Sequence, residues 1–279
     1  MRANRLPAAR GWYWFVGGLQ LWRRSPGIIG LAAMLSFLLS AVVGSVPWLG
    51  AVLICLIGPF IDIFLLRVCH LVDLGRRPTP RDFTVDLKST QATDVRPRVI
   101  GLLILGGVTF AGLMLSKLLM SLLAGDAMAQ LAIASQAAGA SLDAAVAASA
   151  PVAASSAGSP VTLAPNVILA LFFNLGGIFV LSIVMWIAPA LTAFAGVPPL
   201  KSLFFSIVAC WQNKAAFLVF GLSLASLSIP MSLLMMLGGL GQTLVMMVLF
   251  GVLMPACFAS NYLSVTDIFG PLPAPRDAG

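Results

Sequence analysis

One acidic side chain of this sequence lies inside an apolar run, where a charge is costly. Asp62 falls within the run 51–69, three residues after Pro59. If that run crosses a membrane as a helix, a charged Asp near its centre is unfavourable by about 2.5–3.5 kcal/mol on insertion scales. Asp62 should therefore face other helices, be paired, or be protonated.

Two interpretations of Asp62 follow. On a helix, His70 lies about 80° round the axis and about 12 Å along it from Asp62, and Arg67 lies about 140° round, so neither is an ideal partner. The functional interpretation is a proton- or cation-sensing acid at a kink that Pro59 allows. The structural interpretation, which we expect, is an acid bonded to hydroxyls or amides of a neighbouring helix. The candidate functional residues are Asp62, Pro59, His70 and Arg67.

The sequence offers little other material for catalysis. Glu is absent, His70 is the single histidine, and all 9 acidic residues are Asp. No nucleophile elbow, phosphate-binding loop or zinc-protease motif occurs. We therefore expect no enzymatic activity, no catalytic or metal-binding residue and no cofactor. Asn174 and Asn261 are expected to hydrogen-bond neighbouring helices, an interaction that averages about 0.6 kcal/mol in a membrane.

The composition indicates that membrane-spanning elements position these residues. Of the 279 residues, 60% are apolar and 9% charged, and the mean hydropathy is +1.03. Soluble proteins need about 25% charged residues to cover their surface. The net charge of +7 does not indicate nucleic-acid binding, because the basic residues cluster beside apolar runs, which is typical of membrane topology signals.

Runs of about 20 apolar residues match a hydrocarbon layer about 30 Å thick. The predicted fold is all-α and integral to the membrane, with six transmembrane helices arranged as three hairpins. The predicted spans are 27–46, 51–69, 99–123, 167–188, 215–236 and 243–263. They make up a transmembrane domain of residues 27–266, followed by a short tail, 267–279.

Two segments lie outside the spans. Residues 1–26 carry aromatic residues between two groups of arginines, which predicts an amphipathic helix at the membrane interface, a position compatible with packing against the bundle. Residues 124–166 are Ala- and Ser-rich and contain no Lys or Arg, which predicts a periplasmic loop. Its first half, 127–149, could form a helix or a seventh span, although two Gln and one Asp make a span costly.

The basic residues predict the orientation. With six spans and the N-terminus inside, 14 of the 16 Lys and Arg residues fall in segments on the cytoplasmic side. The opposite orientation would place nearly all of them outside, against the positive-inside rule. We expect a multi-pass protein of the bacterial inner membrane with both termini in the cytoplasm.

The three hairpins resemble one another. Each return span is predicted to be interrupted by a proline, namely Pro59, Pro189 and Pro255. Val72-Asp73-Leu74-Gly75 after the first unit resembles Thr266-Asp267-Ile268-Phe269-Gly270 after the third. All units would start on the cytoplasmic side, which corresponds to a parallel repeat. The alternative is that apolar helices with one proline resemble each other by chance.

Short motifs resemble one family. Pro7-Ala8-Ala9-Arg10-Gly11-Trp12, Trp22-Arg23-Arg24-Ser25-Pro26 and Gly58-Pro59 are similar to an uncharacterised family of polytopic proteobacterial inner-membrane proteins. The resemblance covers nearly the whole chain apart from the Ala/Ser-rich segment. It implies location and topology but no activity.

Three function classes remain at this level. We expect a non-enzymatic membrane protein that organises or regulates membrane partners or lipids. The alternative is a transporter or permease for a small solute or lipid, with Asp62 in the pathway; an enzyme is the least favoured. The expected partners are the lipid bilayer and membrane-protein partners or a second copy of the chain, with no nucleic acid.

Overall fold

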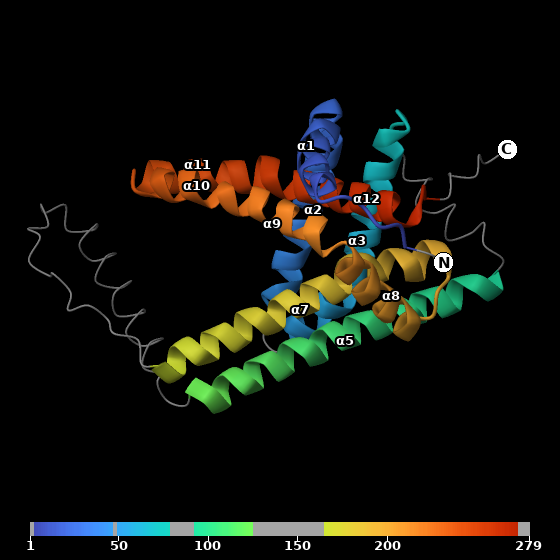
Figure 1. The fold of residues 1–279 in the computed structure, drawn as a ribbon, viewed down its shortest axis with the longest axis horizontal. Coiled ribbons are helices and arrows are strands. Elements are labelled where there is room, and N and C mark those ends of the chain that lie inside the picture. The colour runs from blue at the N-terminus through green and yellow to red at the C-terminus, as the bar shows by residue number, and fades with distance from the viewer. Residues whose placement is uncertain (1–2, 47–48, 79–91, 125–164, 273–279) are drawn as a thin grey trace, which may run out of the picture. The chain divides into compact units, whose positions relative to one another are not determined.

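The computed structural model describes residues 3–46, 49–78, 92–124 and 165–272, and these residues form helices without strands (Figure 1). The helices are α1 Ala9–Arg24, α2 Pro26–Gly44, α3 Leu49–Asp73, α5 Ala92–Ala124, α7 Pro165–Ala195, α8 Pro199–Gln212, α9 Lys214–Ser226, α10 Ser228–Met235, α11 Gly239–Val248 and α12 Met254–Phe269, with a π-helical turn, η1 Leu249–Leu253, before α12. The predicted helix or seventh span at 127–149 lies outside the described residues.

Six of the helical segments are long and apolar enough to cross a membrane. They are Pro26–Gly44, Leu49–Asp73, Arg96–Leu123, Ile168–Ala195, Lys214–Met235 and Gly239–Phe269. The fifth combines α9 with α10, and the sixth combines α11, η1 and α12. The all-α, six-span membrane fold predicted from the sequence is therefore confirmed.

The prediction that a proline interrupts each return span is wrong for two of the three prolines. Pro59 and Pro189 lie inside α3 and α7, which continue to Asp73 and Ala195. A proline removes one backbone hydrogen bond and crowds the preceding turn, and a long helix packed on its neighbours tolerates that loss. Near Pro255 the helix geometry does change. The π-helical turn η1 ends at Leu253, and α12 begins at the next residue with Pro255 in its first turn.

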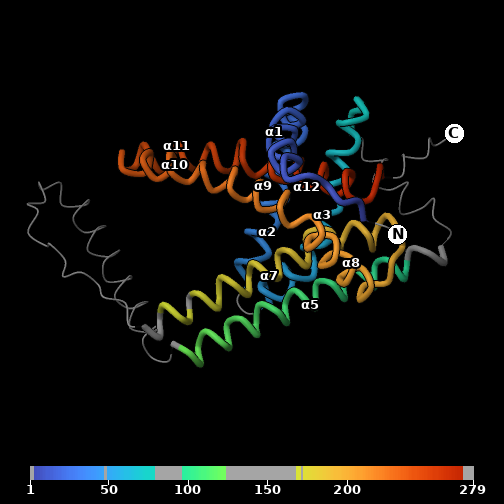
Figure 2. Tube along the Cα trace, in the orientation of Figure 1, coloured from blue at the N-terminus to red at the C-terminus, as the bar shows by residue number. Residues whose placement is uncertain are grey.

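The chain divides into two compact units, residues 1–110 with 182–279, and residues 111–181. In the first unit α2 packs on α3, and α10 packs on α11, so two predicted hairpins are present (Figure 2). A Cβ on Gly101 of α5 would come 2.8 Å from the Thr192 side chain of α7. Within the second unit, Asn174 of α7 donates to the Ser116 hydroxyl of α5 at 3.2 Å. The remaining predicted hairpin, α5 with α7, therefore shows contacts between its two helices within each unit.

The core of the first unit gathers residues from α1, α2, α3, α7, α8, α9 and α12. Its least exposed large side chains include Trp14, Ile29, Leu65, Ile187 and Ile268. A smaller cluster joins α3, α5 and α7 around Leu102, Leu105 and Ala188. α3 and α7 thus both contribute to the two clusters.

The helices of the three predicted return spans, α3, α7 and α12, each end beside a glycine with positive φ. These are Gly75 after α3, Gly196 after α7 and Gly270 after α12, with φ of 71°, 64° and 94°. Residues with a Cβ rarely adopt this backbone conformation, so a glycine allows the chain to turn away directly after the helix. The three predicted repeat units share this ending, although the repeat itself stays a prediction.

Candidate functional site

The four candidate residues from the sequence all lie on α3. Asp62 is half-buried and Pro59 is buried. Cys55, Pro59, Leu66 and Cys69, which are three, four or seven residues from Asp62, are all buried, so Asp62 lies on the packed face of α3. Among the described residues, no hydrogen bond or ion pair reaches its carboxylate. The expected bond to a hydroxyl or amide of a neighbouring helix is therefore not seen there.

His70 belongs to a polar chain that links three helices. Its Nδ1 lies 3.1 Å from the Tyr262 hydroxyl of α12, and that hydroxyl donates to Asp73 Oδ2 at 3.0 Å. Because a tyrosine hydroxyl has one proton, its oxygen accepts from His70, which places the imidazole proton on Nδ1. Arg24 of α1 lies 3.5 Å from the other oxygen of Asp73. Of the sequence candidates, His70 belongs to this chain, and Arg67 is buried three residues before it on α3.

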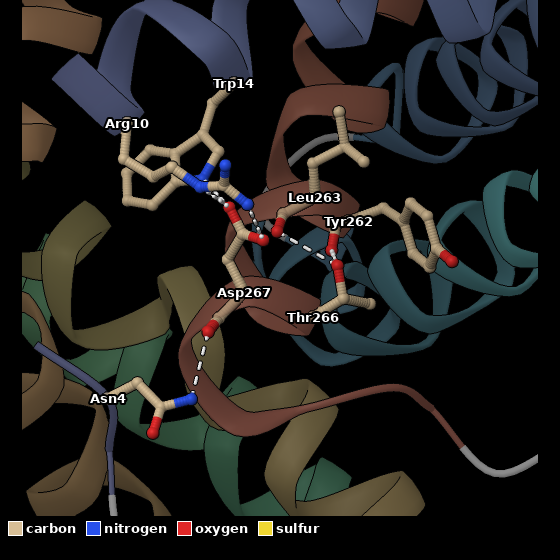
Figure 3. A network of polar contacts seen from close by, with 7 residues as sticks. All are labelled: Asn4, Arg10, Trp14, Tyr262, Leu263, Thr266 and Asp267. Carbon is tan, nitrogen blue, oxygen red and sulfur yellow. Dashed lines mark hydrogen bonds and ion pairs between the residues drawn. The ribbon is translucent and has the colours of Figure 1, made fainter. Parts of the chain in front are cut away.

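Asp267 is the centre of a second and tighter network (Figure 3). Arg10 donates to it twice, from Nε to Oδ2 at 2.9 Å and from Nη2 to Oδ1 at 2.8 Å, and Trp14 Nε1 donates to Oδ2 at 2.8 Å. A bidentate arginine–carboxylate pair with a third donor is among the stronger polar interactions in proteins. The nearby carboxylate raises the pKa of Arg10 above its usual value, chiefly through this hydrogen bond.

The segment before α1 is held by the same region. Asn4 donates from its backbone to Ile268 O at 2.9 Å and from its side chain to Asp267 O at 3.3 Å. Asn213, buried between α8 and α9, accepts from Leu6 N at 2.8 Å and donates to Asn4 O at 3.0 Å. The N-terminal segment is therefore tied to the end of α12 and to the α8–α9 junction.

The packing of α1 explains why its arginines reach these partners. Its buried residues, Gly11, Trp14, Gly18 and Leu21, are spaced three and four apart and form one face of the helix. A Cβ on Gly11 would meet the backbone of Ala216 in α9, and one on Gly18 would come 2.6 Å from Ala256 O in α12. The helix predicted from residues 1–26 therefore exists and packs against α9 and α12; its position at the membrane interface stays a prediction.

Sequence reasoning did not identify Asp73, Asp267, Tyr262, Arg10 or Trp14 as partners. One signal did point to the two aspartates, because the resemblance of 72–75 to 266–270 places them at equivalent ends of two units. In the structure each of them faces an arginine of α1. This resemblance did not indicate the arginine partners, Arg10 and Arg24, because they come from a distant part of the chain.

The remaining polar groups of the spans show mixed outcomes. Asn174 bonds Ser116 as expected of an interhelical amide, whereas the buried Asn261 Oδ1 has no hydrogen-bond partner among the described residues. Trp186 of α7 donates to the Ser264 hydroxyl of α12 at 3.0 Å. Within the ranges that the structure describes, no group of three or more His, Cys, Asp or Glu side chains could hold a metal ion.

Comparison with known proteins shows that the chain is similar in sequence to a membrane protein. It is 28% identical over 277 residues to a probable inner membrane protein of Burkholderia thailandensis, a match that covers 97% of this chain and 94% of the relative. No protein-family model matches the chain, and no solved structure matches it. The similarity confirms the resemblance to uncharacterised bacterial inner-membrane proteins that the N-terminal and Gly58-Pro59 motifs indicated.

Proposed function

We propose that the protein is a non-enzymatic component of a bacterial inner membrane that organises or regulates membrane partners or lipids, with both termini in the cytoplasm. The six apolar helices support a position across a membrane, and the similarity to a probable inner membrane protein of Burkholderia thailandensis supports the inner membrane as the location. The basic residues beside the N-terminus and the returning spans favour the orientation.

The observation that carries this proposal is the two-sided surface of α1. One face is locked to α9 and α12 through Gly11, Trp14 and Gly18, while Trp12 and Tyr13 are exposed on the other side. The Arg10 guanidinium lies 5.9 Å from the centre of the Tyr13 ring. Exposed aromatic residues beside arginines suit the headgroup region of a membrane, where their rings contact lipid and their polar atoms remain hydrated. A helix fixed in this way presents a constant surface to lipids or to a membrane partner.

The polar groups inside the spans weigh against the transporter alternative. A transporter brings polar side chains from several spans together at mid-depth around its substrate. Here Asn174 is bonded to Ser116, Trp186 to Ser264, and Tyr262 to Asp73. These bonds hold helices to one another. Asp62 is the one sequence candidate for a pathway whose carboxylate has no bond among the described residues, so it is the residue on which the alternative depends.

Asp62→Asn separates the two functions, because it keeps the shape of the side chain and removes the charge. Purified protein is reconstituted into vesicles that contain a pH-sensitive dye, and proton flux is followed after an imposed pH step. We expect the protein and its Asp62→Asn variant to give the flux of protein-free vesicles, with equal amounts of both proteins in the membrane. A flux that the natural chain supports and Asp62→Asn abolishes would reject the proposal in favour of a transporter.

A further inference from the structure

α8 has its polar side facing inward, which is the reverse of a helix on a water-soluble protein. Ser202, Ser206 and Cys210, spaced four apart, are buried and face α7. Ser202 accepts from Thr192 Oγ1 at 2.9 Å, and Ser206 Oγ bridges Ile187 N at 3.3 Å and Ile183 O at 3.2 Å. Burial raises the pKa of the Cys210 thiol to about 12, which keeps it protonated. The hydroxyls of Ser202 and Ser206 therefore both hydrogen-bond α7.

One exposed face of α8 is apolar. Leu200, Phe204, Ile207 and Trp211 are 72%, 62%, 45% and 72% exposed, and their spacing of four, three and four residues places them on one face. We call these four residues the α8 stripe. With 14 residues α8 is about 21 Å long, too short to cross a membrane, and it is not one of the six spans.

Two cations accompany the α8 stripe. Lys201 near the start of α8 and Lys214 just after its end are both exposed, and the Lys214 ammonium lies 4.9 Å from the centre of the Trp211 ring. No acidic residue occurs between Asp143 and Asp267, so no nearby acid in the sequence offsets these charges. An apolar face flanked by lysines and a tryptophan matches the boundary between acyl chains and anionic headgroups.

We propose that the α8 stripe inserts into the cytoplasmic leaflet at the headgroup boundary, and that Lys201 and Lys214 bind the phosphates of anionic phospholipids. This inference rests on the proposed function for its orientation and deepens it by naming the lipid class and the surface. A second copy of the chain is the competing occupant. The charges favour lipid, because two copies that met through this face would bring lysines of like charge together.

The depth of the stripe can be measured with an environment-sensitive fluorophore on Ile207→Cys in vesicles of phosphatidylglycerol and phosphatidylethanolamine. The same label on Leu222→Cys, an exposed apolar position of α9, reports lipid contact, and on Arg5→Cys it reports water. The protein without an engineered cysteine gives the background labelling. We expect brominated acyl chains to quench the Ile207 label as they quench the Leu222 label, and aqueous iodide to quench it several-fold less than the Arg5 label. Quenching by iodide alone would overturn the proposal, and protection from both quenchers would overturn it in favour of a protein-covered face.

The headgroup part is tested with the double variant Lys201→Gln/Lys214→Gln in vesicles of mixed phosphatidylglycerol and phosphatidylcholine. We expect the natural chain, extracted with its neighbouring lipids, to be enriched in phosphatidylglycerol and the double variant to lose most of that enrichment. Lys117→Gln, which removes an exposed cation from α5, should keep it. Equal enrichment in the double variant would overturn the anionic recognition. Neither readout depends on Asp62, so failure here and failure of the proposed function are separate results.

Discussion

At the scale of single residues, Asp73 at the end of α3 and Asp267 in the last turn of α12 form comparable contacts of unequal strength. Asp267 accepts three short hydrogen bonds from Arg10 and Trp14, and its side chain is 22% exposed. Asp73 accepts one bond from Tyr262 and lies 3.5 Å from Arg24, and its side chain is 40% exposed. Exposed ion pairs contribute little because water screens them and the side chains lose freedom. Asp267 should therefore stabilise the docked α1 more than Asp73 does.

Replacing Asp267 with Asn tests this difference. Asn keeps the shape but loses the charge and cannot accept on both sides from Arg10, so we expect unfolding of the detergent-solubilised protein to become easier by about 1–3 kcal/mol. Asp73→Asn is the matched variant and should cost less than about 1 kcal/mol. Unfolding is followed by tryptophan fluorescence as denaturant increases. A larger effect of Asp73→Asn would show that the His70–Tyr262–Asp73 chain, and not the Asp267 network, holds α1 in place.

At the scale of elements, α1 is positioned by two close backbone approaches. The glycines that allow them, Gly11 and Gly18, are seven residues apart, so they lie on the same face with Trp14 between them. One approach is to α9 and the other to α12, the first and last helices of the third hairpin. The helix is therefore seated on a hairpin whose sequence lies at the far end of the chain.

Gly11→Ala should undock α1, because the added methyl group would meet the backbone oxygen of Ala216, which has no flexible side chain to move aside. We expect a loss of stability of about 1–3 kcal/mol and easier proteolysis after Arg10. Gly27→Ala in α2 is the control, since nothing lies within 4 Å of its added Cβ. The control should be neutral or stabilising by up to about 1 kcal/mol, because Ala favours a helix more than Gly does. Equal behaviour of the two variants would mean that α1 does not depend on this contact.

At the scale of the whole molecule, the hydropathy of the chain and the six helical spans agree, and the orientation depends on charge. Reporter fusions after Gly75, Pro199 and Gly279 should be cytoplasmic, and a fusion after Ala150 should be periplasmic. The physical reason is that basic residues beside spans resist transfer across the membrane. A cytoplasmic signal at Gly75 with a periplasmic one at Gly279 would mean an odd number of spans, with 127–149 as the candidate for the extra one.

The sequence by itself determined the number and approximate bounds of the spans, because crossing a lipid bilayer requires a local run of apolar residues of the right length. It also determined that residues 1–26 would form a helix and that the fold has no strands among the described residues. The prolines were the exception. Their presence indicated interruptions, but packing on neighbouring helices let α3 and α7 continue through them.

Only the tertiary structure decided which polar groups meet. Arg10 and Asp267 are 257 positions apart in the chain, and no local pattern relates them. It also decided that α8 turns Ser202 and Ser206 inward and Phe204 and Trp211 outward, since spacing shows which residues share a face but not what that face contacts. Asp62 illustrates the same limit: its cost was visible in the sequence, whereas its neighbours depend on how α3 packs. Hydropathy is a local property of the chain, and pairing depends on contacts between distant segments.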